Sequence, residues 1–189
     1  MWSAYAGNRV KNNMQFIISM YRLKLSGFMN KNLKTALNET EGSIQAMSAT
    51  HEMLYDQNDL ENIDSKKYLE NLSERLSRSF DTSNIKIDLN IDTSLDIEKS
   101  IFIGIILNEL FTNSFKYAFL DNKGKIDISL KKTEGEFELI YKDNGIGFEK
   151  ENIKDSFGIK LIETLVIDEL KGQIKLDSSS GTFYKILWR

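Results

Sequence analysis

The chain has 189 residues, of which 41% are hydrophobic and 28% are charged. This composition is typical of a globular protein, and the length favours a small module joined to a medium-sized one. The 25 Lys and Arg against 28 Asp and Glu give a formal net charge of −3, and both signs are spread along the chain, so we expect no nucleic-acid partner. The absence of cysteine excludes disulfides, thiolate metal sites and cysteine nucleophiles.

No stretch of the sequence reaches the roughly 18 apolar residues that a membrane span needs. The first residues show neither the charged nor the apolar region of a signal peptide. We therefore expect a soluble, cytoplasmic chain without a membrane segment. This expectation leaves open whether the chain is the cytoplasmic part of a larger, membrane-bound protein.

The first third of the chain carries two apolar stripes at helical spacing. Apolar residues recur every three or four positions from Val10 to Phe28 and again from Leu33 to Leu54. A short break at 29–32 separates the stripes, so the pattern predicts an antiparallel helical hairpin over residues 1–60. Two helices alone bury little surface, and pairing with a second copy into a four-helix bundle would cover both stripes. We therefore expect a homodimer through these helices.

The hydrophobic pattern of residues 61–189 predicts a second domain that contains both strands and helices. Asp64 can cap a helix whose apolar positions run from Tyr68 to Phe80. Ile101 to Phe119 predicts a long, largely buried helix. Period-two alternation predicts strands at 85–91, 124–132, 136–143, 173–177 and 182–188, and a further helix is predicted at 157–170. The fold class is therefore α+β: a helical hairpin followed by an α/β sandwich with helices on one face of a mixed sheet.

The strongest chemical signal in this second domain is the sequence N-E-L-F-T-N-S-F-K-Y-A-F at 108–119. Glu109 and Asn113 are four residues apart, so on a helix both project from one face toward a common ligand. The amide oxygen of Asn113 suits Mg²⁺, and Glu109 could orient or deprotonate a water or hydroxyl beside that cation. On spacing alone a solvated helix face is the simpler explanation, so this motif does not decide by itself.

Three shorter motifs follow. D-N-G-I-G-F at 143–148 comes after a strand, and the Asp143 carboxylate can accept a hydrogen bond from an exocyclic amine such as that of adenine. S-F-G-I-K at 156–160 opens a helix whose first N–H groups favour phosphate. G-T-F at 181–183 begins a strand, where the Thr182 hydroxyl could join the adenine contact. Singly, these motifs are also explained by a turn, a capped helix start and a strand entry.

The order of the four motifs resembles the N, G1, G2 and G3 boxes of the nucleotide-binding fold that histidine kinases, type II topoisomerases, Hsp90 chaperones and mismatch-repair ATPases share. The likeness covers about residues 68–189 and implies a GHKL-type domain that binds ATP and Mg²⁺. It implies Asn113 and Glu109 at the metal, with Glu109 also catalytic. The cofactor-binding residues that it implies are Asn113, Lys116, Tyr117, Asp143, Gly145, Gly147, Gly158, Lys160 and Thr182.

In this resemblance Asp143 and Thr182 contact adenine, Gly145 and Gly147 form the hinge of a lid around 149–156, and Gly158 lies at the phosphates. Glu109 falls where the ATPase members keep a water-activating glutamate. The same carboxylate occurs in kinases with N-E-L-x-x-N boxes, so it does not decide between hydrolysis and phosphoryl transfer.

The N-terminal segment points to one branch of this fold. N-R-V-K-N-N-M-Q at 8–15 resembles the acceptor box H-R-V-K-N-N-L-Q of a subfamily of sensor histidine kinases, and M-S-A-T-H-E-M-L-Y at 47–55 resembles its second-helix segment. The resemblance then spans nearly the whole chain. It implies a dimerisation and phosphotransfer-like hairpin at 1–60 and a catalytic ATP-binding domain at 61–189.

Asn8 stands where that subfamily places its phosphoacceptor histidine, and Tyr5 stands where it usually has an acidic residue. A carboxamide is far too weak a nucleophile to take up a phosphoryl group, so autophosphorylation at this position is excluded. Three explanations stay open: a naturally degenerate kinase, an engineered change of the acceptor, and first residues that are foreign to the native protein. His51 is the one histidine and should lie at a similar height in the hairpin. As a hypothesis it replaces the acceptor, but we favour a packing role on the apolar seam.

Three functions are compatible with these patterns. The first is a kinase that passes the γ-phosphoryl of ATP to a histidine and then to a response-regulator receiver domain. The second is a non-catalytic dimeric module that binds nucleotide and engages a partner. The third is an ATP-hydrolysing relative that uses Glu109, and the acceptor-box likeness disfavours it.

Overall fold

The computed structural model describes residues 64–189 except 81, 83 and 150–155. The predicted helical hairpin of residues 1–60, with Asn8 and His51, therefore lies outside the described residues. Within the part of the chain that the structure describes, no helix is long and apolar enough to cross a membrane.

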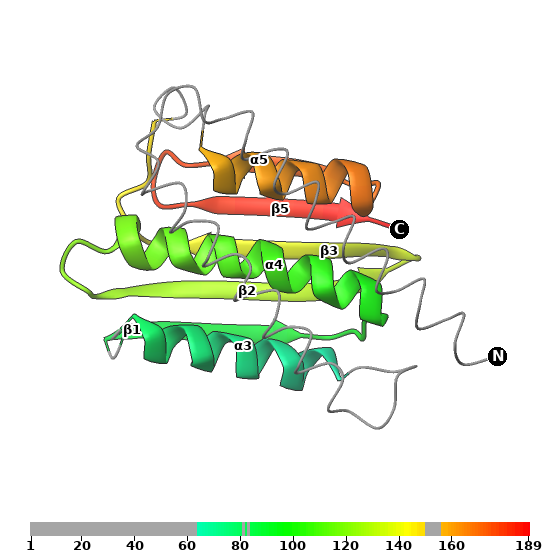
Figure 1. Ribbon diagram of the computed structural model, residues 1–189, viewed down its shortest axis with the longest axis horizontal. Coiled ribbons are helices and arrows are strands. Elements are labelled where there is room, and N and C mark those ends of the chain that lie inside the picture. Colours follow the sequence, from blue (N-terminus) through cyan, green and yellow to red (C-terminus); the bar gives the residue numbers. More distant parts are fainter. Residues whose placement is uncertain (1–63, 81, 83, 150–155) are drawn as a thin grey trace. The chain divides into compact units, whose positions relative to one another are not determined.

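A five-stranded mixed sheet forms the frame of the domain (Figure 1). Its order is β1-β2-β3-β5-β4; β1 and β2 are parallel, and the other neighbours are antiparallel. The strands are β1 (Ile85–Ile91), β2 (Gly124–Thr133), β3 (Glu136–Asp143), β4 (Gln173–Asp177) and β5 (Phe183–Trp188). The strands predicted at 85–91, 136–143 and 173–177 agree with these bounds, and the others differ by one residue at one end.

The turn between β2 and β3 has a local cause. Thr133 pairs with Glu136, and the two residues between them both have positive φ, 52° at Glu134 and 84° at Gly135. Two successive residues with positive φ suit the right-handed twist of a two-residue hairpin. The chain therefore reverses directly from β2 into β3 at Glu134 and Gly135.

Two of the helices begin at an aspartate that caps them. Asp64 accepts a hydrogen bond from the backbone N–H of Lys67 at 3.1 Å, as predicted, and α3 runs from there as Ser65–Ser79. Asp96 does the same for the N–H of Lys99 at 2.8 Å, so α4 is Ile97–Asn113. The start predicted for this helix, Ile101, is four residues too late because the cap precedes its apolar run.

The two helices that carry the predicted motifs change character at their C-terminal ends. After α4, the chain continues without a break as the π-helix η1 (Ser114–Ala118), and after α5 (Phe157–Thr164) it continues as η3 (Leu165–Glu169). Single π-helical turns are often found at functional sites. Here η1 begins one residue after Asn113.

The helices cover one face of the sheet, with α4 between α3 and α5 (Figure 1). Side chains alternate along β2, β3 and β5, so those of one face are buried against the helices and those of the other are more exposed. The core of the described domain includes Ile103, Ile106, Leu107, Leu110, Phe111, Ile126, Ile128, Leu130, Leu139, Tyr141, Tyr184, Ile186 and Trp188. The predicted α/β sandwich is thus confirmed.

Candidate functional site

Asp143 is a buried carboxylate at the C-terminal end of β3, with 1% of its surface exposed. Its Oδ1 accepts hydrogen bonds from the backbone N–H groups of Gly145 at 3.0 Å and Thr182 at 2.9 Å. Its Oδ2 accepts a hydrogen bond from the Ser114 hydroxyl at 2.6 Å. Three donors from three different segments therefore fix both oxygens of this side chain.

A second layer stands behind this carboxylate. The Tyr141 hydroxyl lies 2.8 Å from Ser114 Oγ, to which it donates, and 3.2 Å from the carbonyl oxygen of Leu110. Burial raises the pKa of Tyr141 well above its ordinary value, so the phenol stays protonated and remains a donor. Sequence reasoning missed both Tyr141 and Ser114. Their positions alone do not identify them as partners of Asp143: Tyr141 is two residues before it on one strand face, and Ser114 follows Asn113.

The loop after Asp143 is held from two sides. Gly145 packs against Ala118 of η1, and the Ile146 N–H donates to the Ala118 carbonyl at 3.1 Å. Gly147 has φ of 70°, a conformation that favours glycine, and packs against the backbone of Ser178. The two predicted hinge glycines therefore contact different segments: Gly145 contacts Ala118, and Gly147 contacts Ser178. The predicted lid at 149–156 lies mostly outside the described residues.

The predicted metal and phosphate residues form a second cluster. Glu109 and Asn113 lie one helical turn apart on α4, both half-buried. A Cβ on Gly158 of α5 would lie 2.9 Å from Glu109 Oε2 and 3.7 Å from Asn113 Nδ2. The tertiary structure thus brings the side chains of Glu109 and Asn113 against the start of α5, where a Cβ at position 158 would displace the Glu109 carboxylate and only touch Asn113.

The structure places the remaining predicted residues as follows. Thr182 is buried, and besides its N–H bond to the Asp143 carboxylate, its carbonyl accepts from the Asp143 N–H at 2.9 Å. Lys116 is exposed, with its Nζ 5.9 Å from the centre of the Phe80 ring. Tyr117 is 63% exposed. Lys160 is half-buried in the first turn of α5.

Asn113 and Ser114 join the two clusters because they are neighbours in the chain. Asn113 belongs to the cluster with Glu109 and Gly158, and Ser114 to the cluster around Asp143. The arrangement therefore offers an acceptor for an amine at one end and oxygen ligands for a cation at the other, linked through one backbone segment.

The side-chain oxygens of Glu109 and Asn113 are few enough to suit a Mg²⁺ ion that takes its other ligands from phosphate and water. Among the described residues, no three His, Cys, Asp or Glu side chains converge as a metal cluster. Mg²⁺ is usually held by one or two protein oxygens while phosphate oxygens and waters complete its octahedron. The pair Glu109 and Asn113 therefore suits a cation that arrives with a polyphosphate rather than a resident metal.

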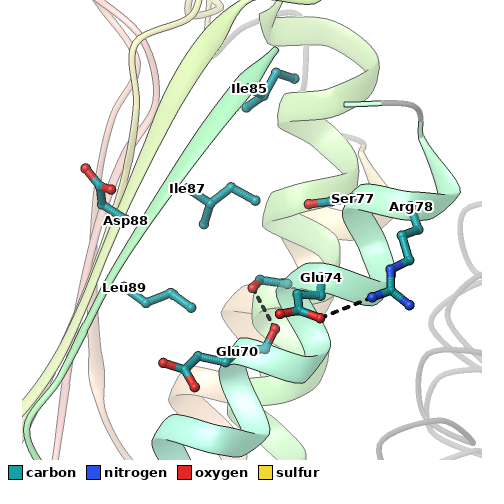
Figure 2. A pocket seen from close by; sticks show the side chains of 9 residues that line it. Glu70, Glu74, Ser77, Arg78, Ile85, Ile87, Asp88 and Leu89 are labelled. Carbon is teal, nitrogen blue, oxygen red and sulfur yellow. Dashed lines mark hydrogen bonds and ion pairs between the residues drawn. The ribbon is translucent and has the colours of Figure 1, made fainter. Parts of the chain in front are cut away.

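A separate groove lies between α3 and β1, at the edge of the sheet (Figure 2). Ile85, Ile87 and Leu89 of β1 face α3, whereas Asp88 points to the other side of the strand. The groove is also lined by polar residues of α3, among them Glu74 and Arg78, which form an ion pair at 3.4 Å. None of the site residues predicted from the sequence lines it.

Two protein families match the chain in tandem. Residues 8–80 match the family described as histidine kinase, and residues 98–188 match the family described as histidine kinase-, DNA gyrase B-, and HSP90-like ATPase. The second match begins near the start of α4 and ends at the last residue of β5, so it contains all four predicted motifs. The first match begins at Asn8.

The curated relatives that match the chain are named as sensor histidine kinases. The sensor histidine kinase PdtaS of Mycolicibacterium smegmatis is 24% identical over 187 residues, which cover 92% of this chain and 36% of the relative. PdtaS of Mycobacterium tuberculosis is 24% identical over 179 residues, with 88% and 34% covered. The chain therefore spans about a third of the length of the curated relatives that it matches.

Solved structures show the same fold. The histidine kinase domain of the blue-light activated histidine kinase EL346 of Erythrobacter litoralis has a TM-score of 0.65 at 20% identity, over 92% of this chain and 83% of that one. The histidine kinase AdeS of Acinetobacter baumannii has a TM-score of 0.58 at 18% identity, over 95% and 96%. The two family matches, in tandem along the chain, show that it belongs to the histidine kinases, as a core in which the histidine kinase segment precedes a GHKL-type ATPase domain.

Proposed function

We propose that the chain is the ATP-binding catalytic core of a two-component sensor histidine kinase. In this role it binds ATP with Mg²⁺ and transfers the γ-phosphoryl group to a histidine, from which an aspartate of a response-regulator receiver domain takes it. The observation that carries the proposal is the pairing of two clusters, one around the Asp143 carboxylate and one around Asn113 and Gly158, through adjacent residues of one helix.

Asp143 is the residue that we assign to the adenine base. An ionised carboxylate only accepts hydrogen bonds, which suits the exocyclic amine of adenine and disfavours the carbonyl oxygen of guanine. Its burial and its three donors hold it in one orientation before any ligand arrives. Preorganisation of this kind reduces the entropy cost of binding.

Asn113 and Glu109 are the residues that we assign to the metal and phosphate end. Mg²⁺ bound there neutralises charge that builds up on the triphosphate during transfer. The Glu109 carboxylate lies next to Gly158, at the start of a helix whose first N–H groups favour phosphate. We assign Lys160, in the same helical turn, to the phosphates as well. Lys116 and Tyr117, which follow on η1, complete the proposed nucleotide-binding set.

The chain has no histidine at the position where the resembling subfamily carries its phosphoacceptor. Asn8 occupies that position, at the first residue of the histidine kinase match. Its amide nitrogen is not nucleophilic, so the γ-phosphoryl must pass to a histidine at another position. Because we favour a packing role for His51, we place that histidine on another protein. We propose a homodimer through the N-terminal helices as the assembly, with a receiver domain as the downstream partner.

A second candidate function is a degenerate kinase that binds nucleotide without catalysis, and Asn8 is the observation that favours it. Incubation with γ-labelled ATP separates the candidates when a histidine-bearing family member is supplied as acceptor. Label on the acceptor supports the kinase, and saturable ATP binding without transfer supports the binding module. Release of free phosphate with no labelled protein would instead support hydrolysis through Glu109.

Asp143→Asn tests the proposed base contact. The amide keeps the shape of the side chain but replaces one acceptor oxygen by an NH₂ donor. This donor would face at least one of the N–H and O–H donors that now bond to the carboxylate, so that hydrogen bond is lost. Hydrogen bonds to charged groups contribute about 1.5–3 kcal/mol, and we expect the Kd for Mg·ATP to rise roughly 10- to 100-fold. Isothermal titration calorimetry measures this. Asp168→Asn, an exposed carboxylate on η3, is the matched control and should bind normally. Equal titration of Asp143→Asn and wild type would refute the assignment.

A further inference from the structure

The Asp143 carboxylate has few acceptor positions left. An ionised carboxylate offers about four lone-pair sites on its two oxygens. Among the residues that the structure describes, Gly145 and Thr182 use both sites of Oδ1, and Ser114 uses one site of Oδ2. The position that remains for a ligand amine is therefore on Oδ2, beside the Ser114 hydroxyl.

The direction of that hydroxyl is itself determined. Tyr141 donates to Ser114 Oγ at 2.8 Å, so the one hydrogen of Ser114 is directed to Asp143 at 2.6 Å. Tyr141 and Ser114 are 0% and 3% exposed, which removes competition from bulk water. Chains of hydrogen bonds in a buried setting strengthen one another. Tyr141, Ser114 and Asp143 thus form a chain of two hydrogen bonds. The chain ends at Asp143 Oδ2, which carries the remaining acceptor position.

Ser114 also sits at a junction in the chain. It is the first residue of η1, directly after Asn113 at the end of α4. The hydroxyl that holds the base-binding carboxylate and the amide assigned to the cation are therefore on consecutive residues. A shift of Oδ2 that follows from loss of this hydroxyl would move the acceptor relative to the metal end.

We propose that Ser114, supported by Tyr141, is the positioning residue that sets the preference of this site for an adenine nucleotide. This inference rests on the proposed function and adds a specificity determinant to it. Ser114 does not touch the nucleotide in this account; it holds Asp143 Oδ2 where the exocyclic amine of the base meets it.

Ser114→Ala removes the donor while Tyr141 keeps the Leu110 carbonyl, 3.2 Å away, as its acceptor. The experiment measures the Kd of ATP and of purine riboside triphosphate, which lacks the exocyclic amine, by calorimetry with Mg²⁺. We expect ATP affinity to fall about tenfold, in line with one charge-assisted hydrogen bond, and analogue affinity to change less than about twofold. The preference for ATP over the analogue should therefore collapse.

Two further variants make the result specific. Ser73→Ala removes another buried serine hydroxyl, one that donates only to the Glu70 carbonyl at 2.8 Å within α3, and should leave both Kd values unchanged. Tyr141→Phe removes the outer donor from a nearly isosteric side chain and should lower the ATP preference in the same direction. It also carries the test if Ser114→Ala does not fold.

The outcomes separate this inference from the proposed function. If Ser114→Ala weakens ATP and the analogue equally, or weakens neither, then Ser114 is a structural residue and the inference is overturned while the base contact stands. If wild-type protein binds ATP no better than the analogue, then Asp143 does not read the amine, and both proposals fail together.

Discussion

Gly158 and Gly145 differ in what an added methyl group would meet. At Gly158 the nearest atom is Glu109 Oε2 at 2.9 Å, the far end of a flexible side chain. At Gly145 the methyl would meet Ala118, including its backbone carbonyl oxygen at 2.6 Å, which cannot rotate away. A methyl group should therefore displace a functional carboxylate at the first position and strain the fold at the second.

Gly158→Ala should affect function with little change in stability. Ala gains about 0.5–1 kcal/mol over Gly within a helix, which offsets the displacement of Glu109. A misplacement of about 1 Å in an active site can lower a reaction rate on the order of 100-fold. Since we assign Glu109 to the Mg²⁺ site, we expect its displacement to reduce the gain in ATP affinity on adding Mg²⁺ about tenfold. Calorimetry with and without Mg²⁺ measures this gain.

Gly145→Ala is the contrasting variant for the same experiment. Overpacking against a rigid neighbour typically costs about 1–3 kcal/mol, so its urea-unfolding midpoint should drop clearly. If Gly158→Ala instead loses as much stability as Gly145→Ala, then the space at Gly158 is required for packing rather than for the position of Glu109.

At the scale of the elements, one acidic side chain on the more exposed face of the sheet forms ion pairs across three neighbouring strands. Glu138 of β3 forms ion pairs with Lys131 of β2 at 2.9 Å and with Lys185 of β5 at 2.6 Å. The hydrogen bond from Lys185, and after it that from Lys131, hold the pKa of the Glu138 carboxyl below its ordinary value. Only 15% of this side chain is exposed, so solvent screens these pairs less than ordinary surface pairs.

Glu138→Gln should reduce the free energy of unfolding in a pH-dependent way. A lowered folded-state pKa means that the contribution of Glu138 is complete above the unfolded value, about 4.3, and is lost as pH falls through the folded value. We expect a difference from wild type of about 0.5–1 kcal/mol at pH 7 that vanishes in acid. Urea unfolding at several pH values measures it. A difference that persists unchanged below the folded-state pKa would show that it does not come from the charge.

The helix ends show how far element prediction from sequence extends. Asp64 was predicted as a cap because it precedes an apolar stripe at helical spacing, and the structure confirms it. Asp96 was missed because the apolar stripe of α4 begins several residues after its cap. The change from α4 to η1 at Ser114 has no local sequence signal that we can identify.

At the scale of the whole molecule, the Asn8 assignment makes a direct prediction. Asn8→His restores an imidazole at the acceptor position, and Tyr5→Glu restores the acidic residue that the resembling subfamily usually has there. We expect the double variant to acquire label from γ-labelled ATP that is acid-labile and alkali-stable, while wild type stays unlabelled at this position. Gel autoradiography after acid and alkali treatment measures it.

Two controls complete this experiment. Addition of Asp143→Asn to the double variant should strongly reduce the label at ATP concentrations near the wild-type Kd, because transfer depends on bound ATP. Addition of His51→Ala should leave it, because we favour a packing role for that histidine. A double variant that binds ATP and stays unlabelled would show that the chain lacks kinase activity beyond the loss of its acceptor, and would favour the nucleotide-binding module.

The sequence by itself determined the order of the helices and strands in the described domain, but not the π-helical ends η1 and η3. Period-two and helical stripes record which side of each element is buried, so strands such as Glu136–Asp143 were predicted to the residue. The four motifs in order led to the shared nucleotide-binding fold, and the two N-terminal segments led to its histidine kinase branch; the tandem matches confirm both.

Only the tertiary structure decided which side chains meet. Gly158 lies against Glu109 although the two are 49 positions apart in the sequence. Likewise, Ser114 at the start of η1 donates a hydrogen bond to Asp143 at the end of β3. Hydrophobic patterning is local and records burial, whereas a hydrogen-bond partner depends on how distant elements pack. That is why Asp143 could be named from the sequence, while the residues that orient it, Ser114 and Tyr141, could not.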